Sequence, residues 1–237
     1  MFFIFVLMGS FLLVSIPQLM AENWSNWLGP NYNGSSENNT ISLPPEGKEF
    51  GIKWKIAVGS GWSAPIIHER SVYFHDRVGE NEIVHRLNID SGAEIWQHSY
   101  FSGYQDSFGM ENGPRSTPSI SSGLIVTHGA QGIIYGIDIT TGKPIWVRDL
   151  KKDFQSPRGF FGRCSSPLIV GDRVIFDVGG NAVGIVAFSL TSGKTLWSSK
   201  PYGNDYSSSL PFFVNGKSFS LSFMRKGFLA MDIYAGS

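Results

Sequence analysis

Six side chains that could take part in binding a ligand lie in three connecting segments of the chain. An arginine can hold a carboxylate through two parallel hydrogen bonds, and a tyrosine hydroxyl can donate another. The segments cover about residues 99–115 and 149–163 and the stretch around 202–206. Loops on a rigid scaffold often carry binding sites, so we predict a ligand site here. The six residues are Asp106, Glu111, Arg115, Arg158, Arg163 and Tyr206.

Arg115 and Arg163 each stand just before a Ser-x-Pro sequence, where we expect the start of a strand that lines a central channel. A ring of arginine, carboxylate and tyrosine there would suit an anionic small molecule or the carboxylate of a peptide. A protein or small-molecule ligand on this channel face is one interpretation. The other is that both arginines pair with Asp106, Glu111 or loop carbonyls and hold the loops in place.

Other kinds of chemistry find no support in the sequence. Cys164 is the only cysteine, so it cannot form an intrachain disulfide, and we expect it to be a buried apolar residue. The histidines show no metal-ligand spacing, and no acidic cluster suits a hard cation. The 19 basic and 19 acidic residues cancel, which argues against a nucleic-acid partner. We therefore predict no catalytic residue, no metal and no cofactor.

A repeated motif indicates how these segments are positioned. In three places a tryptophan follows a glycine by four residues, and the glycines are 50 and 51 residues apart. This period is typical of propeller blades. Each glycine follows Ser or Thr between two apolar runs, which is a hairpin signal because glycine adopts positive φ freely. The pairs are Gly92 with Trp96, Gly142 with Trp146, and Gly193 with Trp197.

Four short apolar runs per period predict blades of four antiparallel strands, so the chain is expected to be an all-β propeller. Each repeated tryptophan should dock one blade on the next, with its N–H donating to a backbone carbonyl. A β-helix is excluded because its rungs are much shorter, and a helical solenoid because helical periodicity is absent. The predicted units are an orphan strand at 52–58, blades at about 62–99, 116–148 and 163–199, and an incomplete blade at 207–237.

The N-terminal segment differs from the repeats. Residues 1–21 carry no charge and are mostly apolar, which predicts a signal peptide and an exported protein, periplasmic or extracellular. No membrane span is expected after its removal. Residues 22–51 are expected to form a clasp, with Trp24 and Trp27 packed against the outer surface of the propeller.

Several of these motifs resemble those of a known family. The sequence from Asp138 to Trp146, together with Asn23 to Pro30 and Gly113 to Pro118, is similar to the pyrroloquinoline-quinone-like β-propeller repeat proteins of an exported bacterial branch. The resemblance implies an eight-bladed ring, of which about half is present here. The family includes quinoprotein dehydrogenases, an outer-membrane assembly lipoprotein and propellers without an assigned activity.

The resemblance implies that the enzymes of that family bind a quinone and a calcium ion with acidic ligands, and that they often contain an adjacent cysteine pair. Cys164 alone cannot supply such a pair. The expected function is a non-enzymatic exported platform for binding or assembly. Two alternatives stay open: a quinone-dependent dehydrogenase with its catalytic blades in the missing half, and a periplasmic propeller that binds carbohydrate or another polymer.

Overall fold

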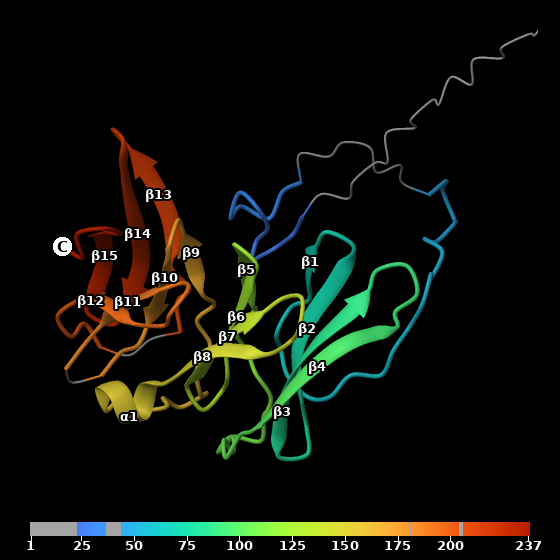
Figure 1. Ribbon diagram of the computed structural model, residues 1–237, viewed down its shortest axis with the longest axis horizontal. Helices are drawn as coiled ribbons and strands as arrows, with labels where there is room; N and C mark the ends of the chain where they lie inside the picture. The colour runs from blue at the N-terminus through green and yellow to red at the C-terminus, as the bar shows by residue number, and fades with distance from the viewer. Residues whose placement is uncertain (1–22, 37–43, 181, 204–205) are drawn as a thin grey trace, which may run out of the picture.

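Four antiparallel sheets, which we call blades I to IV, follow one another along the chain (Figure 1). The computed structural model describes residues 23–36, 44–180, 182–203 and 206–237, so the predicted signal peptide lies outside the described residues. The predicted all-β propeller fold is confirmed. The strands are β1 (Ile66–His68), β2 (Ser71–Val78), β3 (Asn81–Asn88) and β4 (Glu94–Phe101) in blade I; β5 (Ser119–Ser121), β6 (Leu124–His128), β7 (Ile133–Asp138) and β8 (Pro144–Asp149) in blade II; β9 (Leu168–Val170), β10 (Arg173–Asp177), β11 (Ile185–Ser189) and β12 (Thr195–Ser198) in blade III; and β13 (Leu210–Val214), β14 (Lys217–Met224) and β15 (Gly227–Asp232) in blade IV.

The strand order within each blade follows the order along the chain. The first strands of neighbouring blades approach each other, β5 against β9 and β9 against β13. They therefore form the inner side of the arc, and the loops between blades lead back to this side. The only helix among the described residues, α1 (Leu150–Phe154), lies in one of these loops. None of the described residues forms a helix long and apolar enough to cross a membrane.

The core of the molecule lies between the blades. Ile66, Tyr73 and Val84 of blade I are buried in one cluster with Ile125 and Ile137 of blade II. Similar clusters join blade II to blade III and blade III to blade IV. Because one sheet cannot bury both of its faces alone, each blade depends on its neighbours for stability.

One indole docks each blade on the next. The ring of Trp96 packs against Gly142, where an added Cβ would lie 2.7 Å from the ring. Gly142 also has a φ of 70°, which a residue with a side chain adopts only with strain. The side chain of Asp138 accepts hydrogen bonds from the N–H groups of Thr140 and Thr141 and fixes the same turn. The four indole nitrogens each donate to a carbonyl oxygen: Trp54 to Ile89 at 2.8 Å, Trp96 to Ile139 at 2.9 Å, Trp146 to Leu190 at 2.7 Å and Trp197 to Ile233 at 2.8 Å.

Residues 52–58 do not form a strand, although an orphan strand was expected there. Trp54 is docked on blade I in the same way as the other tryptophans. The described part of the chain offers this segment no neighbouring strand, and an extended segment becomes a strand only by pairing its backbone with another.

The N-terminal segment lies on the inner strands, whereas the sequence suggested the outer surface. Trp24 exchanges two backbone hydrogen bonds with Ile67 of β1, at 2.8 and 3.0 Å. The N–H of Ile120 in β5 donates to Ser25, and the hydroxyl of Tyr32 donates to the carbonyl of Ile169 in β9. The inner strands are sheet edges with unpaired backbone groups, and the segment satisfies several of them.

Candidate functional site

A cavity of about 480 Å³, which we call the channel pocket, opens on the inner side of the arc. It lies between the N-terminal segment and the starts of the inner strands. Its lining contains one cation and no carboxylate, and more than half of the Trp62 side chain is exposed. The lining residues are Trp27, Trp62, Ala64, Arg115, Thr117, Cys164, Ser166, Tyr206, Ser207, Ser208, Leu210 and Phe223.

Three hydroxyls of the channel pocket form a row that links the blades. The N–H of Ala64 donates to Oγ1 of Thr117 at 3.2 Å, and the N–H of Thr117 donates to Oγ of Ser166 at 3.0 Å. The N–H of Ser166 in turn donates to Oγ of Ser208 at 2.9 Å. A hydroxyl that accepts from a backbone N–H still carries its own proton. The row therefore fixes three oxygens and leaves three O–H donors that can serve a ligand.

Arg115 holds the first loop and also reaches the channel pocket. Its guanidinium donates to the carbonyls of Gly113 and Glu111 and lies 3.5 Å from the carboxylate of Asp106. It is 5.5 Å from the ring centre of Trp62, within the range of a cation–π contact. The arginine is thus fixed by the loop, and its charge is partly compensated.

The carboxylate of Asp106 organises the loop from within. It accepts hydrogen bonds from the N–H groups of Phe108 and Met110 at 2.7 and 2.8 Å. The hydrogen bond from Met110 is the main reason why the pKa of Asp106 is lowered. Glu111 is exposed and contributes its carbonyl oxygen to Arg115.

Arg158 is not part of the channel pocket lining. Its guanidinium donates to the carbonyl of Gln105 at 3.0 Å and lies 5.4 Å from the ring centre of Tyr104. Arg115 is 5.1 Å from the same ring. Tyr104 thus brings two of the three predicted arginines into one region, together with Asp106, whose carboxylate accepts from its hydroxyl.

Arg163 and Tyr206 have other surroundings. Arg163 is 3% exposed and donates to the carbonyl of Val178 and the hydroxyl of Ser156. Burial lowers its pKa to about 10. The hydroxyl of Tyr206 accepts from the N–H groups of Phe160 and Phe161, and its ring lines the channel pocket. The six predicted residues therefore occupy neighbouring loops but do not converge on one ligand.

Cys164 lines the channel pocket, and burial raises the pKa of its thiol to about 11. It stays protonated at neutral pH, so it does not act as a nucleophile there. Within the described ranges of the chain, no group of three or more His, Cys, Asp or Glu side chains could hold a metal ion.

Sequence reasoning missed the hydroxyl row and Trp62 as parts of the site. The signal was present, because Thr117 and Ser166 are the middle residues of two Ser-x-Pro sequences. Only the fold shows that these positions face each other across neighbouring blades.

A family model described as outer membrane protein assembly factor BamB matches residues 46–236. The 1-butanol dehydrogenase (cytochrome c) of Thauera butanivorans is 23% identical over 168 residues, which are 67% of this chain and 22% of that protein. A europium-containing methanol dehydrogenase has a TM-score of 0.56 at 14% identity, and the match covers 76% of this chain and 41% of that protein. The quinohemoprotein alcohol dehydrogenase from Comamonas testosteroni has a TM-score of 0.55 at 16% identity, and the match covers 76% of this chain and 34% of that protein.

The chain spans about a fifth of the length of the curated relative and less than half of either dehydrogenase structure. The names of the two solved relatives include a europium ion and a quinohemoprotein. The expectation of no cofactor is therefore wrong, since the resemblance points to a quinone and a metal. We predicted no cofactor because the sequence contains neither a cysteine pair nor a spaced acidic cluster, and the lack of these two features does not exclude one.

The match over residues 46–236 covers most of the chain, and the blades with their docked indoles are present throughout that range. The chain therefore belongs to the pyrroloquinoline-quinone-like β-propeller repeat family, whose model is described as outer membrane protein assembly factor BamB.

Proposed function

We propose that this propeller is exported and that its channel pocket binds a planar, anionic ligand of the quinone class, as part of a dehydrogenase-like protein. The hydroxyl row of Thr117, Ser166 and Ser208 carries the proposal, because it presents three fixed O–H donors to one cavity. The predicted signal peptide supports export. The dehydrogenase relatives support the class of ligand.

The residues of the channel pocket fit a quinone that carries carboxylates. The indole of Trp62 offers a flat apolar surface, and Arg115 adds a positive charge beside it. The hydroxyls of Thr117, Ser166 and Ser208 can donate to carboxylate or carbonyl oxygens at the ligand's edge. A bound quinone would supply an acceptor for two electrons from an alcohol. The residues of this chain would orient that acceptor and shield one of its faces from water.

The described residues do not fit the metal. Among them no three ligating side chains come together, and the one carboxylate beside Arg115, that of Asp106, already accepts from two backbone N–H groups.

Titration of the chain with pyrroloquinoline quinone, followed by tryptophan fluorescence and equilibrium dialysis, tests the proposal. The double variant Thr117→Val/Ser166→Ala removes two donors, and its affinity should fall by about tenfold or more, since each hydrogen bond to a charged group contributes roughly 1.5–3 kcal/mol. Ser121→Ala, which removes a hydroxyl outside the pocket, is the control. Equal affinity of the double variant and the wild-type chain would refute the proposal, as would the absence of saturable binding to the wild type.

A second candidate function is a platform for a protein partner. Blade IV exposes several large aromatic side chains, and exposed apolar side chains are common at interaction sites. The family description as an assembly factor supports the same idea. These residues are Phe212, Phe213, Phe223 and Phe228. If the Thr117→Val/Ser166→Ala variant still binds a protein partner, that result would favour the platform over the dehydrogenase-like role.

A further inference from the structure

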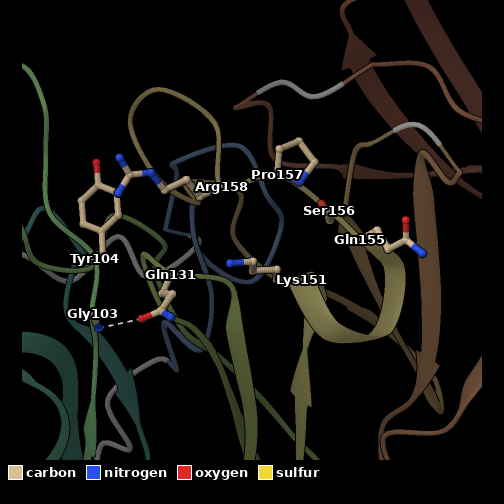
Figure 2. A pocket seen from close by; sticks show the side chains of 8 residues that line it. All are labelled: Gly103, Tyr104, Gln131, Lys151, Gln155, Ser156, Pro157 and Arg158. Atoms are coloured by element: carbon tan, nitrogen blue, oxygen red, sulfur yellow. Dashed lines mark hydrogen bonds between the residues drawn. The ribbon is translucent and has the colours of Figure 1, made fainter.

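A second cavity, which we call the loop pocket, lies away from the channel pocket and shares no lining residue with it. Its volume is about 570 Å³, within the usual range for small-molecule sites. It is formed by the first inter-blade loop, the turn between β6 and β7, and the segment that includes α1 (Figure 2). The lining residues are Gly103, Tyr104, Gln131, Lys151, Gln155, Ser156, Pro157 and Arg158.

The charged groups of the loop pocket are both cations. Lys151 and Arg158 line it, and no carboxylate does. Figure 2 shows the Lys151 side chain extending from α1 toward Gln131, with Arg158 beside the ring of Tyr104. The ammonium group of Lys151 has no hydrogen-bond or ion-pair partner among the described residues.

The acidic side chains closest to Lys151 in the sequence make other contacts. Asp149 caps α1 by accepting from the backbone N–H groups of Lys151 and Lys152, at 3.0 and 3.1 Å. Asp153 pairs with Arg148 at 2.7 Å. Neither carboxylate pairs with the Lys151 ammonium. The carboxylate of Asp106, which accepts from the hydroxyl of Tyr104, lies 3.5 Å from the guanidinium of Arg115. The lining itself therefore holds two cations and no carboxylate.

The remaining polar groups are held so that they donate. Gln131 accepts from the N–H of Gly103 through Oε1 at 2.6 Å, which orients its amide and leaves the NH₂ group to donate (Figure 2). The guanidinium of Arg158 is fixed by the carbonyl of Gln105 and by its contact with Tyr104, and further N–H groups stay available. A site with fixed donors and two cations favours an anion with several oxygen acceptors.

We propose that the loop pocket is a binding site for a small organic dianion, with a carboxylate or phosphate group held by Lys151, Arg158 and the amide of Gln131. Two cations at one cavity match two negative charges, and the volume accommodates more than a bare inorganic ion. The site is separate from the proposed quinone site, so either can fail without the other.

Isothermal titration calorimetry at physiological salt tests this with succinate and inorganic phosphate as probes and uncharged succinamide as the control ligand. We expect saturable binding of at least one anion and none of succinamide. Stronger binding of succinate identifies a carboxylate ligand, and stronger binding of phosphate identifies a phosphate-bearing ligand. Failure of both anions to saturate the chain up to about 10 mM, where the binding free energy falls below roughly 3 kcal/mol, would overturn the proposal.

Lys151→Gln should weaken anion binding by about tenfold or more, because it removes a charge-assisted hydrogen bond. The matched control is Lys152→Gln, which removes the same charge from the next position of α1, outside the lining. It should change the affinity by less than about twofold, since an exposed charge that makes no direct contact is screened by salt. Equal losses in both variants would show only a diffuse charge effect and would refute the site.

Arg158→Gln gives a second test within the same pocket. Its anion affinity should fall by about tenfold, as for Lys151→Gln. Because Arg158 also contacts the loop at Gln105, the urea unfolding midpoint serves as a folding control, and an unchanged midpoint would show that the variant is folded. Unchanged anion affinity in both variants would contradict the proposal.

Discussion

At the scale of single residues, the arginines show what sequence can and cannot predict. Arg115 and Arg163 occupy equivalent places before Ser-x-Pro sequences, and their proximity to the inner strands follows from the repeat. Their surroundings do not follow from it. Arg115 keeps contact with the channel pocket, whereas Arg163 is enclosed by Val178 and Ser156. The difference arises because the two loops differ in length and conformation. The repeat pattern does not include these loops and so does not predict their conformations.

Two buried histidines make stability depend on pH. Burial lowers the pKa of His75 and of His128 from 6.5 to about 3. In the unfolded chain both titrate near 6.5, so between pH 6.5 and about 3 the unfolded state binds more protons. Their contribution to stability is fully present above pH 6.5 and is lost as the pH falls. Each histidine should contribute a slope of about 1.4 kcal/mol per pH unit.

His128→Asn tests this, because the asparagine amide can replace the donor that Nδ1 of His128 provides to the carbonyl of Ser165. Urea unfolding between pH 4 and 7 should show a slope smaller by roughly one proton in the variant, about 1.4 kcal/mol per pH unit. The exposed-surface variant Lys152→Gln should keep the wild-type slope. An unchanged slope in His128→Asn would mean that His128 is protonated in the folded chain.

At the scale of elements, the blades could be predicted and the segments between them could not. The three strands β13, β14 and β15 (Gly227–Asp232) lie within the incomplete blade predicted at 207–237, because hairpin turns separate their apolar runs. The helix α1 has only five residues and shows no apolar periodicity that would predict it. The N-terminal segment around Trp24 bears no repeat either, so only the structure shows that it pairs with β1.

The docking tryptophans should contribute much of the stability between blades. Trp146 is 8% exposed and donates to the carbonyl of Leu190. Trp146→Phe keeps an aromatic ring but leaves that carbonyl unpaired, at a cost of about 1–3 kcal/mol. Trp146→Ala also leaves a cavity and should cost about 3–5 kcal/mol. Trp27→Phe is the control, since Trp27 is 36% exposed. Similar urea midpoints for all three variants would contradict the docking role.

At the scale of the whole molecule, blade IV exposes two neighbouring phenylalanines. Phe223 and Phe228 have ring centres 5.0 Å apart, and both are more than half exposed. Because exposed aromatic surface promotes association, the chain should self-associate at micromolar concentrations. The double variant Phe223→Ser/Phe228→Ser should sediment mainly as a monomer in analytical ultracentrifugation. Phe50→Ser, which changes an exposed residue far from blade IV in sequence, should leave the association unchanged.

A fully monomeric wild-type chain would show that the exposed face of blade IV does not drive association.

The predicted propeller fold is confirmed over the described blades, but the ligand chemistry of the ring depends on loops that carry no repeat. For this reason the sequence predicted the repeated blades, whereas the six candidate residues could be assigned only to the loops between blades and remain a prediction.

A crystal structure of the chain grown with pyrroloquinoline quinone tests the central claim most directly. We expect density for the quinone in the channel pocket, against the exposed indole of Trp62 and within hydrogen-bond distance of the hydroxyls of Thr117 and Ser166. An empty channel pocket at saturating quinone, or a quinone bound at any other place on the arc, would contradict it.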